Sequence, residues 1–202
     1  MRRCLAVVIA VVGAAACAKQ DETTSDAAIA HHDARASDGT APPTCPVNTA
    51  LGTVAVTAQT AVDDVDPPNS LVYTAKLNSD ARPDGLAVQL STGFGAWKTM
   101  RIGPATFPLS GDETSMATCG ACIRIRANID ANDVDEATYM PLSGTMTITS
   151  VSGNFTGSLS NVVFRQVDID GASLATTDNP SHCMATIGSL AFDQLITVNG
   201  NM

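Results

Sequence analysis

Apolar and polar residues alternate along most of the chain beyond residue 45, and this is the pattern of half-buried β-strands. In the run CIRIRANI at 122–129, the isoleucines fall on one face and the arginines on the other. Similar runs lie at 53–58, 70–77, 85–90, 144–151, 154–169 and 184–198. No segment in this part of the chain shows a sustained helical period, so the pattern predicts an all-β domain.

These runs predict one antiparallel β-sandwich over residues 45–202, with a jelly roll or a closed barrel as the alternative arrangement. The letters SGN at 152–154 separate two long runs and predict the turn of a hairpin. The composition agrees, because only 15% of the residues are charged and threonine is frequent. Threonine and the β-branched residues favour strands over helices.

The first sixteen residues have the layout of a secretory signal peptide. Arg2 and Arg3 precede a short apolar run that ends in small residues, and this run is too short for a transmembrane helix of about 20 residues. The letters AAAC at 14–17 resemble a bacterial lipobox, in which the cysteine carries the lipid. The resemblance implies lipidation of Cys17, although Ala14 stands where that motif usually has leucine, so ordinary signal-peptide cleavage stays open.

Residues 17–44 form a polar stretch rich in alanine, aspartate and threonine, which predicts a disordered, lipid-anchored tether. The residue after Cys17 is Ala18, where aspartate would indicate retention at the inner membrane. The lipobox resemblance therefore implies an exported bacterial outer-membrane lipoprotein, on its periplasmic or surface side, that contacts the membrane through its anchor. The net charge of −9 argues against nucleic acid as a partner, because phosphate backbones repel an acidic chain.

Four cysteines remain for the folded domain when Cys4 leaves with the signal and Cys17 carries lipid. In an oxidising compartment an even set predicts structural disulfides. The remaining cysteines are Cys45, Cys119, Cys122 and Cys183. The Cys-x-x-Cys pair precedes a strand and not a helix, which argues against redox chemistry, and a zinc site of this type usually has a second such pair. Because a bridge inside Cys-x-x-Cys gains little chain entropy, we expect Cys119 and Cys122 to join Cys45 and Cys183 in some order.

The segment NIDANDVDE at 128–136 gathers oxygen-bearing side chains in a predicted loop. Carboxylates and amides of this kind are calcium ligands. The candidate ligands are Asn128, Asp130, Asn132, Asp135 and Glu136. Asp133 occupies the place of the glycine that an EF-hand loop requires, so a solvated acidic turn is the alternative interpretation. Calcium is the one cofactor for which the sequence offers a candidate site.

Catalytic motifs are missing from the sequence, and no catalytic residue is assigned. His182 is the one histidine in the predicted domain, and a hydrolase would need carboxylates converging on it. Carbohydrate binding would use exposed aromatic rings, for which Tyr73, Trp97 and Tyr139 are the candidates. Trp97 can serve as such a platform or as an anchor of the core.

Three segments together resemble a group of uncharacterised exported bacterial β-domains. They are TCGACIRIRANID, LSGTMTITSVSGNFTGSLSNVVFRQVDID and CMATIGSLAFD, within residues 118–193. The resemblance implies the fold and the location, and it supplies no activity. The sequence therefore predicts a non-enzymatic, lipid-anchored envelope protein with a structural or adhesive role towards a protein or glycan. A calcium- or carbohydrate-binding module and a hydrolase with an unrecognised site are the alternatives.

Overall fold

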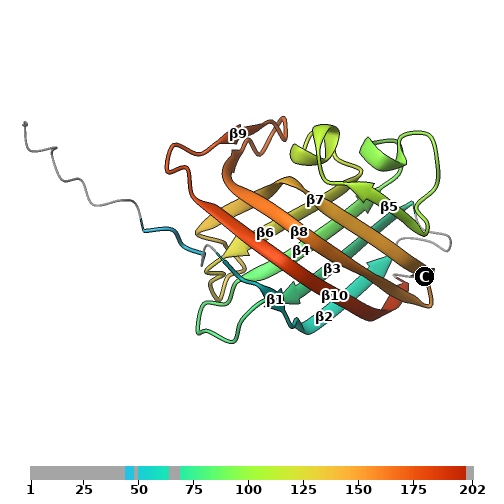
Figure 1. Ribbon diagram of the computed structural model, residues 1–202, viewed down its shortest axis with the longest axis horizontal. Helices are drawn as coiled ribbons and strands as arrows, with labels where there is room; N and C mark the ends of the chain where they lie inside the picture. The colour runs from blue at the N-terminus through green and yellow to red at the C-terminus, as the bar shows by residue number, and fades with distance from the viewer. Residues whose placement is uncertain (1–43, 48–49, 64–68, 199–202) are drawn as a thin grey trace, which may run out of the picture. The chain divides into compact units, whose positions relative to one another are not determined.

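The computed structural model describes residues 44–47, 50–63 and 69–198, and these residues form β-strands joined by turns and two 3₁₀ turns (Figure 1). The strands belong to one compact unit, residues 42–202. The predicted signal peptide (1–16), the lipidation site Cys17 and the predicted tether (17–44) lie outside the described residues, apart from Thr44. The elements are β1 (Thr53–Val54), β2 (Thr57–Asp63), β3 (Ser70–Lys76), β4 (Gly85–Ser91), η1 (Gly95–Trp97), β5 (Ala105–Pro108), η2 (Gly111–Thr114), β6 (Ala121–Ala127), β7 (Ala137–Ser152), β8 (Asn154–Ile169), β9 (Thr176–Asp178) and β10 (Met184–Val198).

Seven of the strands close into a β-barrel. Antiparallel pairs run through β2, β3, β4, β6, β7, β8 and β10 in that order. The ring closes where β10 lies parallel to β2, with Ile196 opposite Ala61. Three short strands extend the wall, because β1 pairs with β10, β5 with β7 and β9 with β8.

The all-β prediction is confirmed, and the arrangement is the closed barrel that the sequence left as an alternative. A sandwich would leave two separate sheets with free edges, whereas here the first and last long strands pair with each other and remove those edges. The pairing is antiparallel throughout the ring except at this closure.

The barrel interior is filled by side chains that alternate along the strands. On β6, Ile123 and Ile125 point inward and are fully buried, as the sequence pattern predicts. Aromatic rings fill one region, where Phe155 and Phe192 stack with centroids 4.6 Å apart and Tyr73 lies 5.5 Å from Phe155. These buried side chains form one packed core inside the ring.

The strand boundaries follow the sequence pattern in some places and depart from it in others. The predicted hairpin is confirmed, since Ser152 pairs with Asn154 across Gly153, which has a φ of 72°. The run predicted at 53–58 is divided into β1, which pairs with β10, and the start of β2, which pairs with β3. Within β2 the register shifts between Thr57 and Thr60, where Ala58 has a φ of 47°. The short outer strands β5 and β9 carry no alternating pattern long enough to predict them.

Candidate functional site

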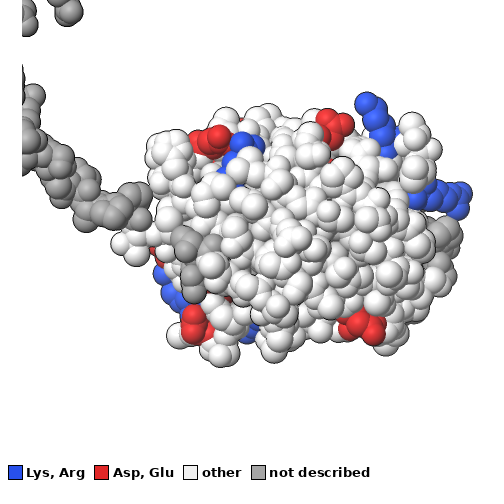
Figure 2. Space-filling model, in the orientation of Figure 1, with Lys and Arg blue, Asp and Glu red and all other residues white. Residues whose placement is uncertain are grey.

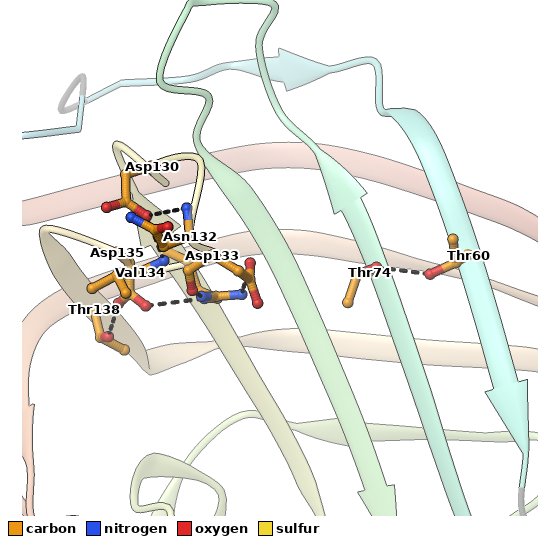
Figure 3. Close-up of polar contacts among 9 residues, drawn as sticks. Thr60, Thr74, Asp130, Asn132, Asp133, Val134, Asp135 and Thr138 are labelled. Atoms are coloured by element: carbon orange, nitrogen blue, oxygen red, sulfur yellow. Dashed lines mark hydrogen bonds and ion pairs between the residues drawn. The ribbon is translucent and has the colours of Figure 1, made fainter.

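The acidic segment predicted to bind calcium is the loop between β6 and β7. Asp130 folds the loop on itself, because its carboxylate accepts the backbone N–H groups of Asn132 (2.8 Å) and Val134 (2.9 Å) (Figure 3). The bonds from Val134 and Asn132 lower the pKa of the exposed Asp130 carboxyl. Asp130 is therefore engaged by the loop's own backbone.

Arg126, at the end of β6, holds two carboxylates of the same loop. Its guanidinium lies 3.0 Å from Asp133 and 3.0 Å from Asp135, and Thr138 also donates to Asp135 (Figure 3). Burial alone lowers the pKa of Arg126, but the hydrogen bond and charge of Asp135 and then those of Asp133 outweigh it and raise the pKa. These acids balance a cation that the barrel wall supplies.

The last predicted ligand, Glu136, also has partners within the protein. It accepts a hydrogen bond from Arg82 at 3.1 Å and one from the side-chain amide of Asn128 at 3.2 Å. Among the residues that the structure describes, no three His, Cys, Asp or Glu side chains lie close enough to hold a metal ion. The structure thus brings the five predicted ligands into one loop without turning them towards one point, and calcium binding stays a prediction.

A shallow depression of about 510 Å³ lies on the outer wall beside this loop. Thr74 and Lys76 on β3, Arg126 on β6 and Asp130 in the loop contribute its polar groups. Thr74 also exchanges a 2.8 Å hydrogen bond with Thr60 on β2 (Figure 3). Among its lining residues, the depression has polar groups and no nucleophile with an adjacent base.

The four domain cysteines form two disulfides, but not the two that we expected. Cys45 joins Cys183 across a sequence separation of 138 residues, and Cys119 joins Cys122. The prediction that Cys119 and Cys122 would each bond to Cys45 or Cys183 is wrong. Ala50 bridges Thr186 near the start of β10, which brings the chain near Cys45 to that strand, while the tight turn into β6 places the Cys119 and Cys122 Cα atoms 5.1 Å apart.

The turn that holds Cys119 and Cys122 is tied to a buried carboxylate that the sequence did not reveal. Glu113, in η2, is only 4% exposed and accepts backbone N–H groups from Ala96 (2.5 Å) and Ala121 (2.7 Å) and, more weakly, from Gly120 (3.4 Å). A side chain on Gly120 would collide with the carbonyl of Phe94, so only glycine permits this approach. Glu113 therefore joins the loop after β4 to the start of β6.

This arrangement argues against dithiol chemistry at the Cys-x-x-Cys pair. Both cysteines are buried, at 3% and 4% exposure, and pack with Met140 and Val167 outside the barrel interior. A reactive thiolate needs access and nearby N–H groups or cations. Here the N–H groups of the two middle residues point to Glu113. The pair acts as a structural staple.

The aromatic residues predicted as carbohydrate platforms lie in the core. Tyr73 and Tyr139 are fully buried, and Trp97 is 1% exposed with its ring edge-on to Phe107 at 5.6 Å. Burial also raises the pKa of Tyr73. Trp97 is thus a core anchor, and its neighbour Phe94 is the exposed ring, at 50%.

His182 lies in the turn before β10, with a φ of 53° and an exposed side chain. It lines a small depression of about 110 Å³ together with Asp178 and Arg165. Arg165 already pairs with Asp178 at 2.6 Å, so this carboxylate balances a cation and is not free to orient the imidazole. The hydrolase hypothesis has no arrangement of residues in its favour here.

The outer wall of β5, β7, β8, β10 and β1 carries rows of short hydroxyl side chains, which we call the hydroxyl wall. They alternate with inward residues such as Met146 and Leu159, which are buried. The members of the hydroxyl wall are Thr53, Thr106, Thr145, Thr147, Ser158, Ser160 and Ser189. Figure 2 shows that the face over β8 and β10 is almost free of charged side chains.

Comparison with protein-family models, with curated proteins and with solved structures finds no match to this chain. Within the described residues, none of the helical segments has the length and apolar character that crossing a membrane requires.

Proposed function

We propose that this chain is a non-enzymatic, lipid-anchored protein of the bacterial cell envelope that binds a protein or glycan through the outside of its barrel. Cys17 carries the lipid in this proposal, and the outer membrane is the location. The observation that carries the binding role is the hydroxyl wall, which places short polar side chains next to one another on an outer face that is almost free of charge.

The hydroxyl wall supports a neutral, polar partner. Across neighbouring strands, Thr145 lies opposite Ser160, Ser160 opposite Ser189 and Ser189 opposite Thr53, so hydroxyl groups repeat at about the 4.8 Å spacing of strands. A broad depression of about 710 Å³ lies over β8, β10 and β1. Hydroxyl groups both donate and accept hydrogen bonds, which suits the hydroxyl groups of a glycan and the exposed backbone of a protein equally.

Two further observations support an exported protein. The first sixteen residues have the layout of a signal peptide. Two disulfides among the described residues are typical of an oxidising compartment such as the periplasm or cell surface.

The anchor is tested by the intact mass of protein purified from envelopes, with and without Cys17→Ala. The proposal predicts fatty-acyl mass on the wild-type chain, and its loss together with release into the soluble fraction for the variant. A wild-type chain that carries no acyl mass and is cleaved elsewhere contradicts the anchor.

The binding role is tested with purified Cys17→Ala protein on isolated peptidoglycan, on envelope polysaccharides and on delipidated envelope proteins. A double substitution in the hydroxyl wall, Thr147→Glu with Ser158→Glu, is expected to abolish binding by introducing charge. Gln89→Glu on β4 is the matched control, because β4 lies across the ring from β8 and β10. No binding by the parent protein, or equal binding by all variants, contradicts the proposal.

A further inference from the structure

The loop between β4 and β5, residues 92–104, exposes two large apolar side chains. Phe94 is 50% exposed and Met100 is 58% exposed, whereas Trp97 and Ile102 in the same loop are buried at 1% and 4%. An apolar side chain exposed to water forgoes the free energy of burial, and exposed apolar groups that gather in one patch mark contact surfaces.

This exposure belongs to a loop that the fold holds in place. Trp97 donates its backbone N–H to Phe94, and Gly93 donates to Trp97, which closes a tight turn. Glu113 binds the N–H of Ala96, and the ring of Trp97 packs on Phe107. Because these contacts hold the loop's backbone in place, the fold itself keeps Phe94 exposed.

The same loop carries two exposed cations, Lys98 and Arg101. In the part of the chain that the structure describes, Arg82, Arg126 and Arg165 form ion pairs with carboxylates. Within that part, Lys76 and Arg124 form none, and neither do Lys98 and Arg101 of this loop. Both loop cations are exposed, and Figure 2 shows lysine and arginine side chains standing out from the end where this loop lies in Figure 1. Of the two acids in the adjoining η2, Asp112 has an exposed side chain and Glu113 is buried.

We propose that loop 92–104 docks on an anionic lipid surface. Phe94 and Met100 enter the boundary between headgroups and acyl chains, and Lys98 with Arg101 contact lipid phosphates. Phenylalanine is among the residues that membrane-surface segments bury at this boundary, and a basic residue near an anionic surface gains attraction that falls off within a Debye length. Loop 92–104 contains two cations and no acid, so its charge is opposite to that of an anionic membrane. The full chain, by contrast, has a net charge of −9.

The inference rests on the proposed envelope location and adds a second membrane contact to the lipid anchor. The predicted tether, residues 17–44, has more residues than either of the longest strands, β7 and β8. An extended chain rises about as far per residue as a strand does. A chain anchored at Cys17 therefore has enough length to reach this end of the barrel.

The test uses the whole exported chain with Cys17→Ala, which removes the anchor, and vesicles of phosphatidylglycerol with phosphatidylethanolamine. Sedimentation is expected to show binding that weakens with salt and is much weaker on phosphatidylcholine. Phe94→Ser with Met100→Ser, and separately Lys98→Ala with Arg101→Ala, should each reduce binding about tenfold or more. Leu195→Ser, at another exposed apolar residue, and Lys76→Ala are the matched controls and should bind as the parent does.

Thermal melting checks that each variant is folded, and the exposed positions of the substituted side chains make unfolding unexpected. No vesicle binding by the parent, equal binding by all variants, or equal binding to phosphatidylcholine overturns the inference. Tighter binding to nucleic acid or to an acidic protein than to vesicles also overturns it. Pure vesicles hold no envelope glycan or protein, so a failure here leaves the hydroxyl-wall experiment unaffected.

Discussion

The two ends of strand β6 hold carboxylates in opposite ways. Before the strand, the single carboxylate of Glu113 is buried and accepts three backbone N–H groups. After the strand, the acidic loop 128–136 is rich in carboxylates, and these are balanced by Arg82, Arg126 and the loop's own backbone. Glu113 at the first end fixes a loop that exposes apolar and basic side chains. At the second end, the carboxylates already have partners in nearby arginines and backbone N–H groups.

The difference shows that a segment with the composition of a metal site can also bind its carboxylates to neighbouring cations and backbone N–H groups. In the acidic loop, the carboxylate oxygens accept hydrogen bonds from Arg82, from Arg126 and from the loop's own backbone. Glu113 stands in an unremarkable stretch, GDET, yet it positions the loop that we propose to contact membranes. The following predictions test this contrast, beginning with the largest expected effect.

The two disulfides are expected to differ in how much they stabilise the fold. Replacing Cys45 and Cys183 with alanine should cost about 5 kcal/mol, because this bridge closes a loop with a sequence separation of 138. Replacing Cys119 and Cys122 should cost about 2 kcal/mol, since their separation is 3. Urea unfolding measures both. Equal losses would show that the Glu113 end depends on its disulfide more than we infer.

Glu113→Ala is expected to cost about 3 kcal/mol, because it leaves buried N–H groups without an acceptor. The loss should be accompanied by faster amide exchange at Ala96 and Ala121. Asp112→Ala, at an exposed neighbour in the same 3₁₀ turn, should change stability by less than about 0.5 kcal/mol. Similar effects of the two substitutions would remove the contrast between the ends.

Arg126→Gln is expected to cost about 1 kcal/mol, because its side chain is 21% exposed and holds both Asp133 and Asp135. Arg82→Gln should cost less than about 0.5 kcal/mol, since the side chains of its pair with Glu136 are about half exposed. Chemical unfolding at low and high salt measures both, and salt should reduce the Arg82 effect more. If Arg82→Gln lowered the free energy of unfolding more than Arg126→Gln did, this order would be wrong.

Asp130 is expected to contribute to stability on the acid side. Its pKa is lower when folded than its unfolded value of about 3.9, so its contribution is present above that pH and is lost as pH falls through the folded pKa. Asp130→Asn keeps an acceptor and removes the charge, so it should flatten the fall of melting temperature below about pH 4. Asp170→Asn should act likewise, because Ser173 lowers the pKa of Asp170. An unchanged acid profile contradicts this assignment.

Calcium is expected to have the smallest effect on the wild-type chain. Arg82 already pairs with Glu136 and Arg126 with Asp135, and the loop's own backbone engages Asp130. Millimolar calcium should therefore leave the melting temperature unchanged. A calcium-dependent rise that Asp130→Asn or Glu136→Gln abolishes would instead establish the calcium site and reverse our interpretation of this end.

The sequence predicts what depends on local periodicity. Strand β6 and the β7–β8 hairpin follow from alternation and from the turn at Gly153. The closure of the barrel does not, because the parallel pairing of β10 with β2 joins segments more than a hundred residues apart and leaves no local signal. Period-2 alternation describes one buried face equally well in a sandwich and in a barrel.

The candidate site was less predictable than the fold. The acidic loop was located from its composition, but its ion pairs depend on where Arg82 and Arg126 fall across strands. Phe94 and Trp97 stand three residues apart in a loop without periodicity, so nothing local shows which ring enters the core. Glu113 depends on the close approach of Gly120 to Phe94, which only the folded chain creates.

Hydrogen–deuterium exchange of the Cys17→Ala chain, with and without vesicles of phosphatidylglycerol and phosphatidylethanolamine, tests the contrast between the two ends most directly. The account predicts slower exchange on binding at amides of loop 92–104, with loop 128–136 unchanged. Protection of loop 128–136 in place of loop 92–104, or no protection of either under conditions where the chain sediments with the vesicles, would contradict it.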